Sequence, residues 1–100
     1  MIRVIIERRI AESLEQVYEQ RARAALREAV DIPGFISGET LQDAKNPNHR
    51  VILSNWRSEQ HWYRWQNSPQ RRAMMAQIRP MLEDEERVLV LRHTGQSDWG

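Results

Sequence analysis

The sequence predicts an α+β fold in which helices cover one face of a four-stranded antiparallel sheet. Four short aliphatic segments are typical of strands, and two longer stretches carry apolar residues at the helical interval. The chain has 100 residues, of which 40% are hydrophobic and 29% charged, so it is long enough for one core and too short for two. We therefore expect a single domain over residues 1–94, followed by a flexible C-terminal tail at residues 95–100.

The first strand is expected over residues 2–9, where aliphatic and charged residues alternate. The first helix is expected to begin at Ser13, an N-cap with Gln16 three positions later, and to run to about residue 30. Pro33-Gly34 then ends the helix and turns the chain into the next strand.

The middle of the chain predicts a β-hairpin. Its strands are expected at residues 35–43 and 50–56, which are rich in strand-forming residues. Between them, Asn46-Pro47-Asn48 has the composition of a turn.

Two further helical segments and a last strand complete the prediction. Ser58 is expected to cap a short helix, and Ser68-Pro69 to start another. The inward residues of that second helix are Met74, Met75, Ile78, Met81 and Leu82. Pro80 marks its last turn, and residues 87–92 form the final strand.

The predicted order, β-α-β-β-α-β, folds most simply as a ferredoxin-like sheet with its helices on one face. Alternate residues of a strand point to opposite faces of the sheet, and here both alternating sets are apolar. One carries Phe35, Leu41, Val51, Leu53, Leu89 and Leu91, and the other carries Ile36, Ile52, Val88 and Val90. Because the helices hide only one face, we expect a homodimer that buries the helix-free face.

Charge and composition exclude several classes of function. The net charge of +1 offers no field for nucleic acid or an anionic membrane, and Arg71-Arg72 is interpreted as part of a solvated face. Charged residues follow the first apolar ones too closely for a signal peptide, and no apolar run is long enough to span a membrane. With no cysteine in the chain, we expect a cytoplasmic protein.

The strong local catalytic motifs are absent. His49, His61 and His93 lack metal-ligand spacing, and the carboxylates of residues 83–86 are interpreted as a solvated loop, so no metal is expected. RNA-recognition modules share the predicted topology but stack bases on aromatic residues of their central strands. Trp56, at the end of the third strand, is the only such aromatic here, so nucleic acid is not an expected partner.

The region around the short helix holds three of the four tryptophans. A strand ends in Trp56, a Ser58-Glu59 pair opens the helix, aromatics stand three apart, and Trp65 is followed three residues later by Ser68. In these features, and in Pro33-Gly34-Phe35, the chain resembles the antibiotic biosynthesis monooxygenase family of the dimeric α+β barrel superfamily. The resemblance extends in order and spacing over nearly the whole chain.

The resemblance implies a homodimer of ferredoxin-like subunits, each with a pocket between its sheet and its helices. Some members of the family are oxygenases that use neither metal nor flavin on quinol- and anthrone-like substrates, because the deprotonated substrate itself reduces oxygen. That branch needs no cofactor. Another branch binds and degrades haem.

The haem branch relies on an asparagine in strand one, a tryptophan in the short helix and an axial histidine in the next helix. Trp65 matches the tryptophan, whereas Arg8 and Met75 stand at the other two positions. Haem degradation is therefore not expected. Met75 shares the apolar interval of Met74 and Ile78, which favours packing.

The candidate site is a pocket near the short helix. His61, one turn before Trp65, has the side chain of a general base at neutral pH, and these two are the candidate catalytic residues. The candidates for substrate contacts are Arg8, Trp62, Trp65, Asn55, Asn67 and Met75. Structural roles also explain them: the tryptophans anchor the helix on the sheet, the asparagines cap locally, and His61 lies at a solvent rim.

The leading hypothesis is a cofactor-independent monooxygenase that accepts a small aromatic, quinol or anthrone-like substrate. The alternative is a non-catalytic dimeric protein of the same fold that binds a ligand or is associated with stress. Oxygen uptake with a panel of quinols discriminates between the two.

Overall fold

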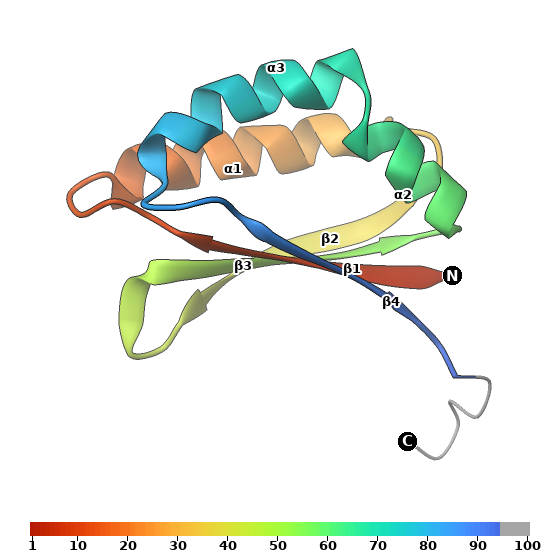
Figure 1. Cartoon of the computed structure of the whole chain (residues 1–100), viewed down its shortest axis with the longest axis horizontal. Coiled ribbons are helices and arrows are strands. Elements are labelled where there is room, and N and C mark those ends of the chain that lie inside the picture. Colours follow the sequence, from red (N-terminus) through yellow and green to blue (C-terminus); the bar gives the residue numbers. More distant parts are fainter. Residues whose placement is uncertain (95–100) are drawn as a thin grey trace.

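The computed structural model describes residues 1–94 and shows a sheet with helices on one face (Figure 1). The strands are β1 (Ile2–Arg9), β2 (Phe35–Asp43), β3 (Asn46–Trp56) and β4 (Arg87–Arg92). The helices are α1 (Glu15–Ala29), α2 (Glu59–Gln66) and α3 (Pro69–Ile78), and a 3₁₀ turn, η1 (Arg79–Met81), follows α3 directly. The predicted C-terminal tail at residues 95–100 lies outside the described residues.

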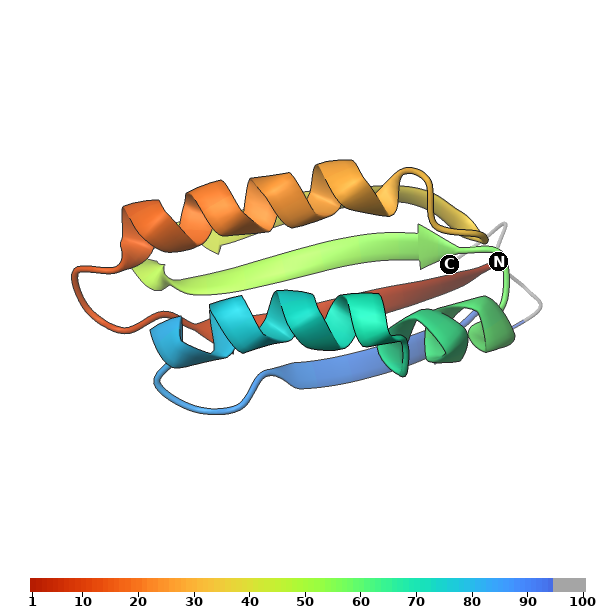
Figure 2. The same cartoon turned by 90° about the horizontal axis from the view of Figure 1, so that it is seen from above.

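The strand order is β2-β3-β1-β4, and each neighbouring pair is antiparallel. This order puts β1 and β3 in the centre and brings the first and last strands of the chain together. Helix α1 and the α2–α3 pair lie side by side over the same face of the sheet (Figure 2). The predicted α+β fold with ferredoxin-like topology is confirmed.

The covered face of the sheet supplies the core. All even-numbered residues of β1 are buried, and Val4 is completely inaccessible. One apolar cluster gathers around Trp56, Trp62 and Trp65, and a second around Tyr18, Met75 and Ile78. Ile6 of β1 belongs to the first cluster, and Ile10, which directly follows β1, belongs to the second. Arg8 therefore lies between the clusters, at a position that strand alternation directs into the core.

The predicted cap of α1 is wrong. The helix begins at Glu15, and no side chain caps its first turn. Ser13 has a φ of +75°, and its N–H donates a hydrogen bond to the Glu15 carboxylate at 3.0 Å. The same carboxylate accepts a hydrogen bond from Asn48 Nδ2 at 2.8 Å, which ties the loop to β3. Contacts with residues outside the helix thus determine where the helix begins.

The hairpin turn lies earlier than predicted. Strand β3 already begins at Asn46, so Ala44 and Lys45 form the turn. Asp43 stabilises it, because its Oδ1 accepts a hydrogen bond from the Lys45 N–H at 2.8 Å. Pro47 is tolerated as the second residue of β3, where a missing ladder donor matters least.

A bulge at the start of β2 corrects the predicted sides of Phe35 and Ile36. The register shifts between Phe35 and Ser37, so one extra residue interrupts the alternation. Phe35 consequently packs edge-on against Trp56 in the covered core, with ring centroids 5.4 Å apart. Ile36 is 47% exposed.

The opposite, helix-free face is apolar along its middle. Leu53, Ile5 and Leu89 are direct neighbours across β3, β1 and β4. Leu41, Leu89 and Leu91 are each exposed. Within residues 1–94, no helix lies over this face (Figure 1). None of the described helices is long and apolar enough to cross a membrane.

Candidate functional site

A pocket lies between the sheet and the helices, where β1, β2 and β3 face α1, α2 and α3. Most of its wall is aliphatic or aromatic. The aromatic part consists of Phe35, Trp56, Trp62 and Trp65. The charged part consists of Arg8 from β1 and Arg71 from α3. The pocket thus combines surfaces that hold a planar ring with a cationic end.

The pocket is small in this structure. Its volume is about 50 Å³, whereas a dry cavity that binds benzene has about 150 Å³. Leu26 and Met74 are part of its wall and are only partly buried, and a methionine side chain rearranges readily. A ring-sized ligand therefore has to displace these two side chains.

A buried cluster of charges forms the cationic end. Glu86, just before β4, accepts hydrogen bonds from Arg8 Nε at 2.8 Å and from Arg71 Nη2 at 2.7 Å. The side chains of Arg8, Arg71 and Glu86 are 2%, 8% and 12% exposed. Arg8 Nη1 also donates to the Tyr18 hydroxyl at 3.1 Å, and the Arg71 guanidinium lies 5.5 Å from the centre of the Trp62 ring. Two cations and one carboxylate leave this cluster with a net charge of +1.

The charge runs predict solvated surfaces at residues 83–86 and 71–72, and this is wrong for Glu86 and Arg71. Burial has the largest effect on Glu86 and opposes its ionisation, but the attraction of the two arginines outweighs it. The pKa of Glu86 therefore lies below its ordinary value of 4.5. One signal for the cluster exists in the sequence, because Arg8 at an inward-facing strand position requires a buried counter-ion.

Trp62 carries an indole N–H without a partner. The residue is 1% exposed and packs edge-on against Trp56, with ring centroids 5.5 Å apart. Within the described part of the chain, its buried Nε1 has no hydrogen-bond partner. Trp56 differs, because its Nε1 donates to Ser54 Oγ at 3.1 Å. Since buried polar groups are normally paired, the Trp62 N–H requires an explanation.

His61 does not line this pocket. It lies in the first turn of α2, where its Nδ1 is 2.7 Å from Ser58 Oγ. Ser58 also caps α2 by accepting the His61 N–H, as predicted. The imidazole ring lies so close to Gly34 that a Cβ there would be 2.2 Å from His61 Cγ. A role of His61 as general base remains a prediction.

The two asparagines and Met75 also lie away from the pocket lining. Asn55 is on the helix-free face, next to Ser37, with which it forms a hydrogen bond of 3.0 Å. Asn67 is exposed at the C-terminal end of α2, and its Nδ2 donates to a carbonyl of that helix. Met75 is 2% exposed within the second apolar cluster. Of the predicted substrate contacts, the structure brings together Arg8 and the two tryptophans of α2.

The pocket does not fit haem. Met75 Sδ accepts a hydrogen bond from Arg8 Nη2 at 3.5 Å, so the sulfur faces the charged cluster. Among residues 1–94, no group of three or more His, Cys, Asp and Glu side chains is arranged to hold a metal ion.

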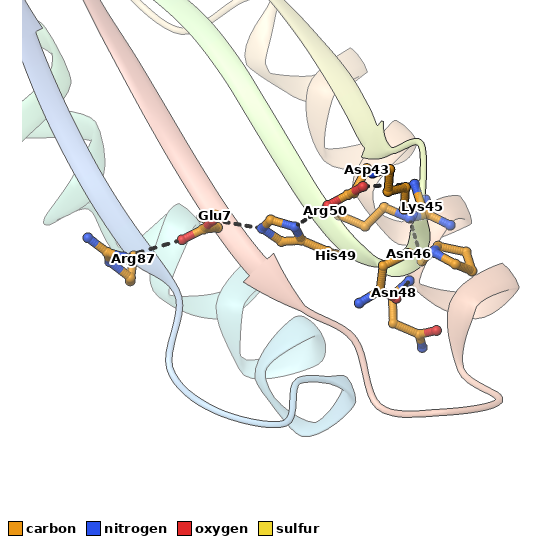
Figure 3. A network of polar contacts seen from close by, with 9 residues as sticks. Glu7, Asp43, Lys45, Asn46, Asn48, His49, Arg50 and Arg87 are labelled. Atoms are coloured by element: carbon orange, nitrogen blue, oxygen red, sulfur yellow. Dashed lines mark hydrogen bonds and ion pairs between the residues drawn. The ribbon is translucent and has the colours of Figure 1, made fainter.

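A second polar cluster lies at one end of the helix-free face (Figure 3). His49 is part of β3 rather than of a turn, and its ring nitrogens lie 2.7 Å from Glu7 and 3.0 Å from Asp43. Arg87 is 3.6 Å from the other carboxylate oxygen of Glu7. The pKa of His49 is raised above 6.5, most strongly by the hydrogen bond with Asp43 and next by that with Glu7. The sheet separates this cluster from the pocket, which favours a structural role.

Comparison with known proteins places the chain in a family. The profile of the family "Antibiotic biosynthesis monooxygenase" matches residues 1–77. Protein SchA of Streptomyces halstedii is 31% identical over 71 residues, which make up 69% of this chain. The chain spans only 19% of the length of SchA.

Solved structures share the fold over nearly the whole chain. Rv0793 from Mycobacterium tuberculosis aligns with a TM-score of 0.83 and 18% identity, and covers 96% of this chain and 97% of its own. SnoaB from Streptomyces nogalater, a cofactor-independent oxygenase, aligns with a TM-score of 0.78 and 15% identity, and covers 95% of this chain and 96% of its own. At these identities the likeness concerns the fold alone.

The family match includes β1 with Arg8, the tryptophan helix α2, and Arg71 at the start of α3. It ends before Glu86 and β4, which complete the charged cluster and the sheet. Because the match covers more than half of the residues, and because the ferredoxin-like sheet and its helices agree with solved relatives, the chain belongs to the antibiotic biosynthesis monooxygenase family.

Proposed function

We propose that the protein is a cofactor-independent oxygenase of a small, electron-rich hydroxylated aromatic, such as an anthrone or a quinol. The observation that carries this proposal is a pocket with aromatic walls beside a buried cluster of net charge +1. The ionised form of such a substrate is the one that reacts with oxygen, and a fixed interior cation favours that form. The fold shared with SnoaB supports the reaction class.

The reaction needs only the substrate and dioxygen. An ionised anthrone carries part of its negative charge on the ring carbon opposite its oxygen, and this carbon transfers an electron to dioxygen. The two radicals combine in a new C–O bond, and protonation yields a hydroperoxide. Loss of water then breaks the O–O bond and the remaining C–H bond and leaves a carbonyl. The substrate loses four electrons, and dioxygen gains them as one carbonyl oxygen and one water.

The residues of the pocket have simple tasks in this scheme. Trp62 and Trp65 hold the ring, Arg8 and Arg71 stabilise its anion, and the apolar walls exclude water. None of the described residues that line the pocket is a His, Asp or Glu. The proton of the substrate is therefore released to solvent, and the pocket selects the anion.

Oxygen consumption with a panel of anthrones and quinols tests the proposal. We expect uptake that depends on the protein, that persists with a metal chelator, and that incorporates one labelled atom from ¹⁸O₂ into the product. A compound that raises the melting temperature but is never oxidised would instead support a non-catalytic ligand-binding protein.

Trp65→Phe separates a role in the pocket from a role in packing. The change keeps a large ring but removes the indole N–H and some volume, so packing alone predicts a stability loss of about 1–2 kcal/mol with unchanged oxygen uptake. A pocket role predicts that activity falls clearly more than stability. In the same assay, unchanged turnover of His61→Ala would remove His61 from the candidate catalytic residues.

A further inference from the structure

We infer that Trp62 determines the specificity of the pocket by donating its indole N–H to an oxygen atom of a monoanionic aromatic ligand, a phenolate or an enolate. The inference rests on the proposed function for the aromatic character of the ligand. It goes further by naming the atom that recognises the anion and by requiring a single negative charge on the ligand.

The first support is the unpaired donor. A buried N–H without a partner destabilises a protein, because it has lost its hydrogen bond to water and gained none in return. Trp62 is 1% exposed, its Nε1 is unpaired among the described residues, and its side chain is part of the pocket wall. A ligand oxygen that reaches Nε1 would satisfy this donor.

Several of the other polar groups nearby are engaged in hydrogen bonds within the protein. Trp56 Nε1 donates to Ser54 Oγ at 3.1 Å, and the same hydroxyl donates to the Val4 carbonyl at 3.4 Å. Arg8 and Arg71 each donate to Glu86. Among the fully buried side-chain nitrogen and oxygen atoms of the described residues, Trp62 Nε1 is the one without a hydrogen-bond partner.

The second support is the charge beside that donor. The cluster of Arg8, Arg71 and Glu86 carries a net charge of +1, and the Arg71 guanidinium lies 5.5 Å from the centre of the Trp62 ring. Interior charges without counter-ions are unfavourable. A neutral phenol leaves this charge uncompensated, and a dianion brings one negative charge too many. A monoanion matches it.

Equilibrium binding of para-nitrophenol tests the inference without any turnover, because this electron-poor phenol is not an oxygenase substrate and its ionised form alone is yellow. Binding to the wild-type protein is expected to lower the pKa of the probe by about one unit or more, as an opposite charge at short range does. Nitrobenzene, which lacks the hydroxyl group, is the matched neutral ligand, and its affinity is measured by displacement of the probe.

Trp62→Phe keeps an aromatic ring but removes the donor. We expect it to bind para-nitrophenolate about tenfold more weakly or worse, since a hydrogen bond to a charged group is lost. Nitrobenzene affinity is expected to change by less than about threefold, because no donor contact to a ligand hydroxyl exists there. Tyr63→Phe removes a hydroxyl from an exposed residue of the same helix and is expected to bind both probes like the wild type.

Several outcomes would overturn the inference. Equal weakening of both probes in Trp62→Phe would show that the ring only packs, and unchanged binding of both would show that the ligand does not use the N–H. An unshifted or raised pKa of the bound phenol, or no binding at millimolar concentration, would reject the anionic ligand. If Trp62→Phe does not fold, benzothienylalanine at this position keeps the bicyclic ring without the N–H and allows the same comparison.

Failure of the inference and failure of the proposed function are distinguishable. Oxygen uptake with an unshifted probe would reject the anion-selective pocket and keep the oxygenase. A shifted probe with no uptake of oxygen by any anthrone or quinol would keep the pocket and reject the oxygenase.

Discussion

Within residues 1–94, Glu86 is the one carboxylate that pairs with both Arg8 and Arg71. Glu86→Gln leaves both guanidinium groups buried without a counter-charge, so we expect the free energy of unfolding to fall by about 3–5 kcal/mol. Urea unfolding measures this. Glu85→Gln, at the exposed neighbouring position, is the matched control and should change stability by no more than about 0.5 kcal/mol.

The contribution of Glu86 also has a defined pH dependence. Since its pKa is lowered in the folded protein, the stabilisation is fully present above pH 4.5, the ordinary value, and is lost as the pH falls through the lower folded value. The difference in stability between the wild type and Glu86→Gln should therefore shrink on acidification. A difference that stays constant down to acid unfolding would contradict the ion-pair explanation.

Gly34 is required by both conformation and space. Its φ is +88°, and a Cβ would lie 2.2 Å from His61 Cγ. We expect Gly34→Ala to lower stability by about 2 kcal/mol or more, of which about 1–2 kcal/mol is the left-handed backbone. Thermal unfolding of the double variant with His61→Ala should recover the steric part. Strictly additive losses would show that the ring does not limit this position.

Local patterns predict part of the site, and contacts between distant segments account for the rest. Helical spacing suffices to direct Trp62 and Trp65 towards the sheet, and strand alternation suffices to direct Arg8 inward. The burial of Arg71 and Glu86 follows from a pairing that only the folded sheet creates, because Glu86 lies 78 positions after its first partner. A run of carboxylates carries no sign of which member turns inward.

At the scale of elements, periodicity predicts the strands and helices, while boundaries depend on single residues. The start of α1 shifts because Ser13 adopts a left-handed conformation, and the hairpin turn shifts because Asp43 binds the N–H of Lys45. The bulge after Phe35 is likewise a one-residue event that changes the side of the sheet to which a residue belongs. None of these events alters the hydrophobic pattern that a sequence displays.

His49 links three strands, because it lies on β3 and contacts Glu7 of β1 and Asp43 of β2. Its raised pKa means that its contribution is fully present below pH 6.5 and is lost as the pH rises through the higher folded value. The pKa values of Glu7 and Asp43 are lowered from 4.5 and 3.8, respectively. The stability that these two carboxylates contribute is therefore lost only as the pH falls through their lower folded pKa values.

We expect His49→Gln to lower stability by about 1 kcal/mol or less, since the cluster is partly exposed and screened by salt. The loss should be larger near pH 6 than near pH 9, about the range over which the histidine gives up its proton. Unfolding curves across this range measure it, and His93→Gln, exposed beyond the end of β4, is the matched control. A loss that grows with pH would contradict the predicted sign.

At the scale of the whole molecule, we propose that two copies pack through their helix-free faces. The row of Leu53, Ile5 and Leu89 crosses the middle of this face. Exposure of such an apolar row to water is unfavourable, and a second copy would cover it. Light scattering coupled to size exclusion should give twice the mass of one chain. Leu89→Lys should shift the protein to a monomer, whereas Val17→Lys, at an exposed position of α1, should not. A wild-type protein that remains monomeric at micromolar concentration would contradict this proposal.

The central place of β1 in the sheet has a consequence for synthesis on the ribosome. This strand emerges before its two neighbours, β3 and β4. The backbone groups along both of its edges therefore stay unpaired until these later strands have been translated. Glu86 and β4 come last, and until then Arg8 and Arg71 have no counter-ion to share. A nascent chain that stalls before Glu86 therefore presents an open strand edge and an uncompensated interior charge. Such a chain is expected to bind chaperones and to be degraded by proteases.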